Sequence, residues 1–86
     1  MRRGWVSSPE YRQLIAGLKA QRETRGISQR ELARRVNRPG SFINKIELME
    51  RRLDVLEFIV IALALDASPS ALLEDLAKDL PPDIRL

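Results

Sequence analysis

Residues 28–47 read SQRELARRVNRPGSFINKIE, and this stretch decides the fold of the chain. Ser28 precedes Glu31 by three residues, which is the spacing of a capping box at the start of a helix. Residues 37–40 have the composition of a tight turn, and apolar residues at helical spacing resume directly after it. Two short helices joined by a tight turn, with arginines on both sides of it, predict a helix-turn-helix.

Three further helices are expected around this stretch, each with a start signal of a capping side chain followed by proline or an acid. Glycine or proline supplies the stop signal where one is present. These helices are expected from Ser8-Pro9 to Gly26, from Asp54 and Glu57 to Leu65, and from Ser68-Pro69 to Pro81-Pro82. No segment alternates with period two, so the predicted fold class is all-α, a compact domain of five helices.

With 86 residues, the chain is long enough for one small hydrophobic core. We expect an N-terminal arm over residues 1–8, one domain over residues 9–79 and a C-terminal tail over residues 80–86. Apolar residues at helical spacing predict the core. The expected core residues are Tyr11, Leu14, Ile15, Leu18, Leu32, Ala33, Val36, Ile43, Ile46, Val55, Phe58, Ile59, Ile61, Ala62, Leu65, Leu72, Leu73 and Leu76.

The chain contains no cysteine and no histidine, and these absences exclude many kinds of site. Disulfides, zinc fingers, thiol nucleophiles and Ser-His-Asp chemistry all require one of the two. A Ser-Lys or paired-carboxylate site is the alternative that these absences leave open, but a chain this short rarely encloses a substrate cleft. We therefore expect no enzymatic activity, no metal, no cofactor and no small-molecule ligand. The longest apolar run, from Phe58 to Leu65, has 8 residues. A membrane span needs roughly 20, so we expect no membrane contact and a cytoplasmic location.

The net charge of +3 conceals a strong polarity along the chain. Residues 1–52 hold 13 basic and 5 acidic side chains and carry +8, whereas residues 53–86 hold 2 basic and 7 acidic side chains and carry −5. An uneven solvated surface is one interpretation. The other is a basic face for a polyanion, with an acidic end directed away from it.

Motifs in four successive helices resemble the lambda-repressor-like (Xre/Cro-type) helix-turn-helix family over about residues 14–76. They are Arg22, Gly26-Ile27-Ser28-Gln29, Glu31-Leu32-Ala33, Ile43, Ile46-Glu47 and Ala64-Leu65. One subgroup is also similar in Arg38-Pro39, Ser41-Phe42 and Glu50 to Val55. The resemblance implies a five-helix DNA-binding domain, usually dimeric, that acts as a transcriptional regulator. The helix after the turn would lie in the major groove and the helix before it across the phosphate backbone.

Ser41 and Lys45 match groove-facing positions of the family, and Asn44 lies one turn after Ser41. Asn pairs bidentately with adenine, Lys reaches guanine and Ser approaches either, so these are the expected base-reading residues. Gly40 stands at a further base-reading position, where relatives in the subgroup carry glutamine, and its lack of a side chain removes one base contact. An ordinary exposed helix surface is the alternative.

The resemblance implies that Gln29, at the start of its helix, bonds a DNA phosphate. The alternative is that Gln29 serves only to begin the helix. The other expected phosphate-binding residues are arginines near the turn, which offer the charge that phosphates need. They are Arg30, Arg34, Arg35, Arg38, Arg51 and Arg52. A solvated helix face is the alternative for these arginines. Arg22 and Glu47 match a pair that family members join as a structural salt bridge.

Three positions depart from the family pattern. Gly40 weakens the start of the recognition helix, so Ser41 is expected to be its cap. Met49 stands where a glycine usually ends that helix, so the helix is expected to continue a further turn or the loop to differ. Leu48 stands where polar phosphate contacts are common.

The helix that follows Asp54 is apolar on all sides, which is typical of a helix buried on all sides. Beside the core positions, Leu56, Val60 and Leu63 form a second apolar stripe. We expect this stripe to form a homodimer interface with help from Leu76 and Leu80, because such apolar area is uncommon on monomers. The alternative is that Leu80 and Ile84 fold back to cover the stripe.

These observations predict a sequence-specific regulator of double-stranded DNA, most simply a dimeric repressor that occludes a promoter at an inverted repeat. Activation through an acidic patch at Glu74, Asp75 and Asp79 is a second possibility. The rival from another class is an antitoxin-like module that binds a partner protein and only secondarily DNA, with residues 80–86 as its candidate binding segment.

Overall fold

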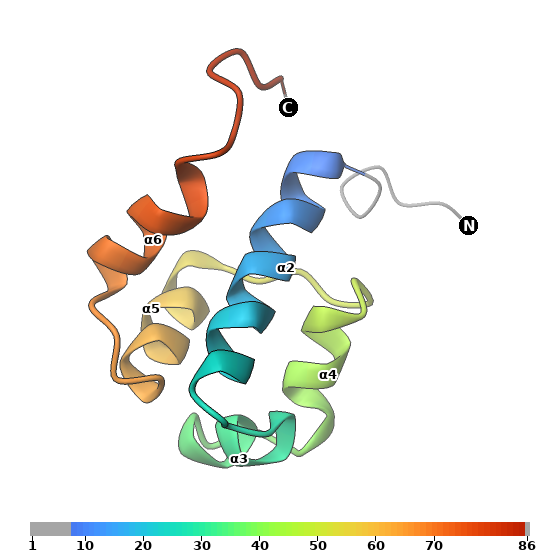
Figure 1. The fold of residues 1–86 in the computed structure, drawn as a ribbon. Helices are drawn as coiled ribbons and strands as arrows, with labels where there is room; N and C mark the ends of the chain where they lie inside the picture. Colours follow the sequence, from blue (N-terminus) through green and yellow to red (C-terminus); the bar gives the residue numbers. More distant parts are fainter. Residues whose placement is uncertain (1–7, 86) are drawn as a thin grey trace.

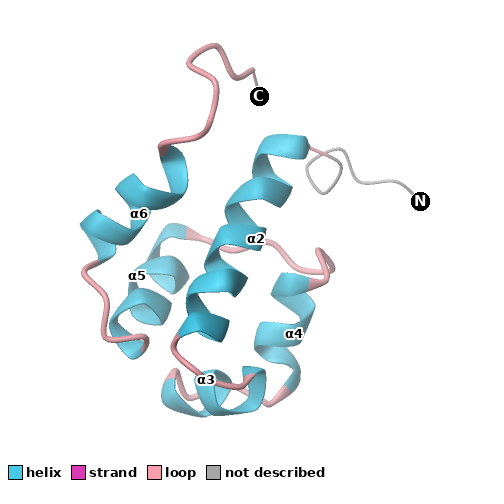
Figure 2. Ribbon diagram, viewed as in Figure 1, coloured by secondary structure: helices cyan, strands magenta, loops and turns pink. Residues whose placement is uncertain are grey.

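The computed structural model describes residues 8–85, so the predicted arm over residues 1–8 lies outside it apart from Ser8. The described chain forms α2 (Pro9–Thr24), α3 (Gln29–Arg35), α4 (Ser41–Glu47), α5 (Val55–Ala64) and α6 (Pro69–Ala77). Figure 2 shows loops between these helices and no strand anywhere in the described range. The predicted all-α fold of five helices is therefore confirmed.

Helix α2 forms the centre of the domain (Figure 1). Helix α3 crosses its C-terminal end, α4 lies on one side of it, and α5 and α6 lie on the other. Gly17 on α2 leaves room for Leu76 on α6, because a Cβ atom at residue 17 would lie 2.6 Å from the Leu76 Cδ2 atom and displace that side chain. The helix-turn-helix of α3 and α4 is thus supported on one face by the rest of the domain.

Side-chain caps begin most of the helices. Ser8, Ser28 and Ser68 accept hydrogen bonds from backbone N–H groups three residues later, and Asp54 forms a reciprocal capping box with Glu57. The capping box predicted at Ser28 forms only in its first half, because the Glu31 carboxylate turns to arginines instead.

The start of α4 differs from the prediction. Gly40 occupies the N-cap in a helical conformation and makes no side-chain cap bond, while Ser41 is the first helical residue. The prediction that Ser41 caps the helix is wrong, since the chain already turns helically one residue earlier.

The end of α4 also differs. The helix stops at Glu47, and Met49 adopts the left-handed conformation with φ 66°, so the predicted further turn does not form. A backbone hydrogen bond from Glu50 N–H to Lys45 C=O closes the helix end, and the Met49 side chain packs on the core. These contacts offset the cost of a left-handed methionine.

The core lies between the five helices and contains most of the predicted residues. They are Ile15, Leu18, Leu32, Ala33, Ile43, Ile46, Ile61, Ala62, Leu65 and Leu72, together with Phe42, which was not predicted. Val55, Ile59 and Leu73 were predicted to be buried and are exposed, Val55 by 76%. For Val55 and Ile59 the reason is that α5 turns only the side with Ile61 and Ala62 toward the core. On α6, Leu72 points into the core and the adjacent Leu73 points outward.

Asp66 follows α5 in the left-handed conformation, with φ 59°. Replacing Asp66 with glycine should stabilise the protein by about 1 kcal/mol, because glycine relieves the left-handed strain and removes a negative charge from a helix C-terminus. Thermal unfolding should then show a midpoint about 4–8 °C higher. Asp66→Ala keeps the strain and serves as the control; a similar rise in that variant would contradict the explanation.

Candidate nucleic-acid interface

A buried ion pair sets the position of α4. The Arg22 Nε atom lies 2.8 Å from Glu47 Oε2, and both side chains are less than 10% exposed, at 9% and 8%. Arg22 Nη2 bonds to Glu47 Oε1 at 3.0 Å, and Arg22 Nη1 donates to the Ile27 carbonyl at 2.7 Å. The hydrogen bonds to Glu47 raise the pKa of Arg22 above its usual value. This network joins α2, α4 and the loop before α3.

Gln29 belongs to the same network. Its Nε2 atom donates a hydrogen bond to Glu47 Oε1 at 2.7 Å, which links the first residue of α3 to α4. A side-chain amide carries two N–H donors, so this bond uses half of the donor capacity of Gln29.

The predicted base-reading residues lie on the outward side of α4. Its inward side is formed by the buried Phe42, Ile43 and Ile46. Ser41 and Lys45 are exposed and Asn44 is half-buried; the three recur at the i, i+3 and i+4 spacing of one helix face. Gly40 is exposed at the N-cap, and Leu48 is 56% exposed at the C-cap.

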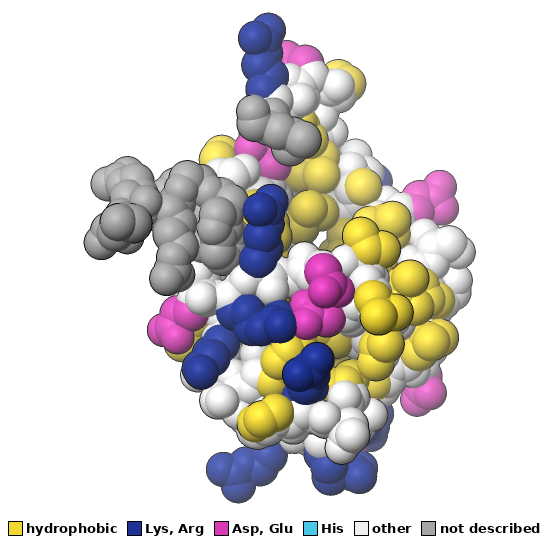
Figure 3. Space-filling view, turned by 180° about the vertical axis from the view of Figure 1, so that it is seen from behind, with side chains coloured by type: hydrophobic (Ala, Val, Ile, Leu, Met, Phe, Trp, Pro, Cys, Tyr) yellow, Lys and Arg dark blue, Asp and Glu magenta, His cyan; other side chains and the backbone are white. Residues whose placement is uncertain are grey.

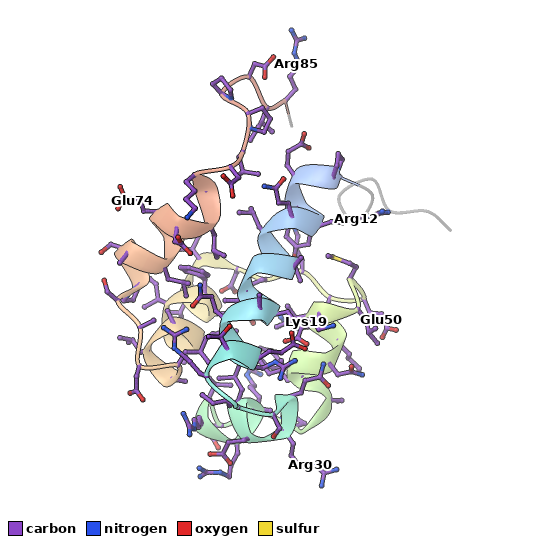
Figure 4. The ribbon with its side chains drawn as sticks, viewed as in Figure 1. Arg12, Lys19, Arg30, Glu50, Glu74 and Arg85 are labelled. Carbon is purple, nitrogen blue, oxygen red and sulfur yellow. The ribbon has the colours of Figure 1, made fainter. Side chains whose placement is uncertain are left out.

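Two arginines of α3 and the one arginine of the turn line one open groove. This groove, here called the arginine groove, has a volume of about 540 Å³ and includes Arg30, Arg34, Arg38 and Gly40 in its lining. Figure 4 shows Arg30 pointing outward from α3, whereas Glu74 projects from α6 on the side of the domain away from α4.

Two arginines of α3 share one carboxylate. Arg34 Nε and Arg35 Nε donate to the Glu31 oxygens at 2.9 and 3.0 Å. These bonds lower the pKa of Glu31 to about 2. Arg35 also donates to the Ala64 carbonyl at 3.0 Å, so it connects α3 to the end of α5. The Arg34 side chain remains 70% exposed beside the arginine groove.

Arg51 is held by contacts within the domain. Its guanidinium donates to both Glu57 oxygens, at 2.9 and 2.7 Å, and its Cζ atom lies 4.8 Å from the centre of the Phe42 ring. The hydrogen bonds from Arg51 lower the pKa of Glu57. Arg52 is exposed beside it.

Three basic residues near α4 have no carboxylate partner within the described residues. Within residues 8–85, no carboxylate lies within ion-pair distance of Arg30, Arg38 or Lys45. The pair of Glu31 and Arg35 has the i, i+4 spacing of one helix face, which the sequence does signal. The pairing of Arg51 with Glu57 on α5 depends on tertiary contacts, so sequence spacing alone does not separate Arg51 from these three.

A second surface lies on α5. Leu56 and Leu63 are 69% and 58% exposed, and Val60 is exposed between them. Leu76 and Leu80, predicted to assist, are half-buried. Ile84 is itself exposed, and the tail leaves the stripe open, so the alternative in which Leu80 and Ile84 cover it is wrong. Figure 3 shows apolar side chains gathered on the side of the domain where α5 and α6 lie.

Within residues 8–85 there is no group of three or more carboxylates placed to hold a metal ion. No single helix of that range is long and apolar enough to cross a membrane; only α5 and α6 together, with a bend of 110° between them, reach such a length and composition.

An exposed polar helix face, a tight turn and a basic groove beside it define a helix-turn-helix domain of the kind that binds DNA. The sequence matches the helix-turn-helix family model over residues 18–72, which is more than half of the chain. The chain therefore belongs to the Xre-type helix-turn-helix family of DNA-binding transcription regulators. No match was found among curated protein sequences.

Solved structures agree with this assignment. An XRE-family like protein from Pseudomonas syringae pv. tomato str. DC3000 is 43% identical, with a TM-score of 0.77 over 84% of this chain and 88% of that one. A point mutant of the restriction-modification controller protein C.Esp1396I is 28% identical, with a TM-score of 0.76 over 88% and 98%. The clp gene regulator ClgR from C. glutamicum shares the fold, with 21% identity and a TM-score of 0.72 over 88% and 99%.

Replacing Arg22 with methionine should destabilise the protein by ~3–5 kcal/mol, because Glu47 would remain buried without its partner. Urea denaturation measures this loss. The double variant Arg22→Met/Glu47→Leu should recover most of it, since no buried charge is left behind. Losses that simply add in the double variant would contradict a coupled buried pair.

Proposed function

We propose that this protein is a sequence-specific regulator of double-stranded DNA that acts as a homodimer and represses transcription by occluding a promoter. The observation that carries the proposal is the position of three basic residues without a carboxylate partner within residues 8–85. Arg30 and Arg38 line the groove that includes the N-cap of α4, and Lys45 lies on the outward face of that helix. Positive charges left without a counter-charge beside a polar helix face suit a duplex, whose phosphates supply the missing charge.

In this proposal Ser41, Asn44 and Lys45 contact base edges in the major groove. Asn offers a donor and an acceptor suited to adenine, and Lys donates to guanine. The Ser hydroxyl can contact either base. Gly40 brings the backbone near the bases without a side chain of its own. Specificity therefore rests on few direct contacts and, in addition, on the sequence-dependent shape of the duplex.

Arg30, Arg38 and the exposed Arg34 bind phosphates along the arginine groove, and the second N–H of Gln29 binds another at the start of α3. Arg52 lies exposed at the opposite end of α4 and extends the contact. We assign Arg35 and Arg51 a bracing role instead, because each is held by a carboxylate and by a backbone carbonyl.

A second copy of the chain covers the stripe of Leu56, Val60 and Leu63 on α5, and the exposed Val55 and Ile59 enlarge the apolar area available to it. A two-fold dimer presents two α4 helices roughly 34 Å apart, one turn of duplex. The operator is then an inverted repeat whose half-sites have centres about 10 base pairs apart. A dimer seated on a promoter in this way excludes RNA polymerase.

Two groups of variants separate the roles in DNA binding. Asn44→Ala and Lys45→Ala should relax sequence preference by about 1–3 kcal/mol at the affected base pair. Arg30→Ala and Arg38→Ala should weaken binding evenly across sequences and reduce the slope of log K against log salt by about 1. Titrations against a panel of duplexes at several salt concentrations measure both effects. The assignment fails if the two groups behave alike.

The dimer is tested by Leu63→Glu, which places a charge in the centre of the stripe. The wild-type protein should sediment as a dimer at low micromolar concentration and this variant as a monomer, because an unpaired charge at an apolar interface is costly. Leu48→Gln is the matched control, since Leu48 is similarly exposed but lies on α4; it should remain dimeric. A monomeric wild-type protein would refute the interface.

A further inference from the structure

We propose that Phe42 is a positioning residue that holds the guanidinium of Arg38 at the edge of the arginine groove, ready for a DNA phosphate. The proposal rests on the proposed DNA binding and adds to it a residue that orders one of the side chains in contact with DNA. It concerns a cluster of four side chains, Arg38, Phe42, Arg51 and Glu57.

The geometry of the cluster centres on the aromatic ring. The Cζ atoms of Arg38 and Arg51 lie 5.3 and 4.8 Å from the centre of the Phe42 ring. Both distances are within the range of an attractive cation–π contact. The ring is buried in the core, so it is a fixed platform and not a mobile surface group.

The charges of the cluster do not cancel. Two guanidinium groups near one ring repel each other, and Glu57 compensates one of them by its two hydrogen bonds to Arg51. Arg38 has no ion pair within residues 8–85, although its charge contributes to lowering the pKa of Glu57. The net positive charge of the cluster therefore resides at Arg38.

Arg38 lies where its positive charge can bind a DNA phosphate. It lines the arginine groove with Arg30 and Arg34, two residues before the N-cap of α4. The Phe42 ring and the charge of Glu57 attract the guanidinium in the free protein, and Arg38 remains exposed at the groove, where it can meet a DNA phosphate.

Stacking on the ring also limits the freedom of the Arg38 side chain before DNA arrives. Arginine loses several rotatable bonds when it is immobilised at an interface, and a side chain already ordered in the free protein loses less. Arg30 provides the comparison, since it lines the same groove and has no aromatic contact within the described residues. Phe42 thus separates two otherwise similar phosphate contacts.

A double-mutant cycle on DNA affinity tests the proposal. Phe42→Leu should weaken binding to duplex DNA about threefold to fivefold, because the Arg38 side chain must then be ordered during binding. In an Arg38→Ala background the same substitution should have almost no further effect, because the side chain it orders is absent. In an Arg30→Ala background it should keep its full effect. Equal factors in both backgrounds would overturn the proposal.

Ordering of the arginines in the wild-type protein provides a second measurement, independent of any core variant. NMR relaxation of the side-chain Nε–H groups in the DNA-free protein should give Arg38 a higher order parameter than Arg30, and equally low values would overturn the proposal. Thermal unfolding of Phe42→Leu checks that the variant is folded, and Phe42→Met replaces it if it is not. A wild-type protein that binds no duplex would refute the proposed function as a whole, whereas DNA binding without the coupling refutes this proposal alone.

Discussion

The buried pair of Arg22 and Glu47 is the interaction on which the geometry of the interface depends. Helix α4 has only seven residues and no side-chain cap at its start, so its own hydrogen bonds do little to fix its direction. Glu47 accepts bonds from Arg22 on α2 and from Gln29 at the start of α3. Because both charges are removed from water, displacing either one is costly. The outward face of α4 therefore keeps a constant relation to α3 and the arginine groove.

The remaining basic residues divide according to what they contact. Arg35 and Arg51 bind carboxylates and backbone carbonyls, and so hold α3 and the loop after α4 against α5. Arg30, Arg38 and Lys45 have no carboxylate partner within residues 8–85, and in our proposal they meet the phosphates and bases of a duplex. One basic surface would then both fix the fold and attract a polyanion. The acidic residues of α6 lie away from this surface, as Glu74 illustrates in Figure 4, and so do not neutralise it.

Local signals made most of the fold predictable, since Ser8, Asp54 and Ser68 begin helices and Gly26 ends one as expected. Prediction failed where tertiary contacts choose between equivalent local options. In α5, apolar on every side, periodicity does not tell which face turns inward, so the exposure of Val55 and Ile59 was missed. The left-handed Met49 depends on core packing, and the pairing of Arg51 with Glu57 and Phe42 depends on three segments meeting. The outward position of Ser41, Asn44 and Lys45 followed from helical spacing.

In our proposal the stripe on α5 joins two copies of the chain, and the two α4 helices then require a particular kind of operator. A single α4 helix contacts few base pairs, and two of them held by a dimer double the site and set its spacing. Selection of bound duplexes from a randomised library tests this account most directly, because it assumes nothing about the sequence. The account predicts an enriched inverted repeat with half-site centres about 10 base pairs apart and a yield that falls steeply with salt. Recovery of no preferred sequence, at any ionic strength, would contradict it.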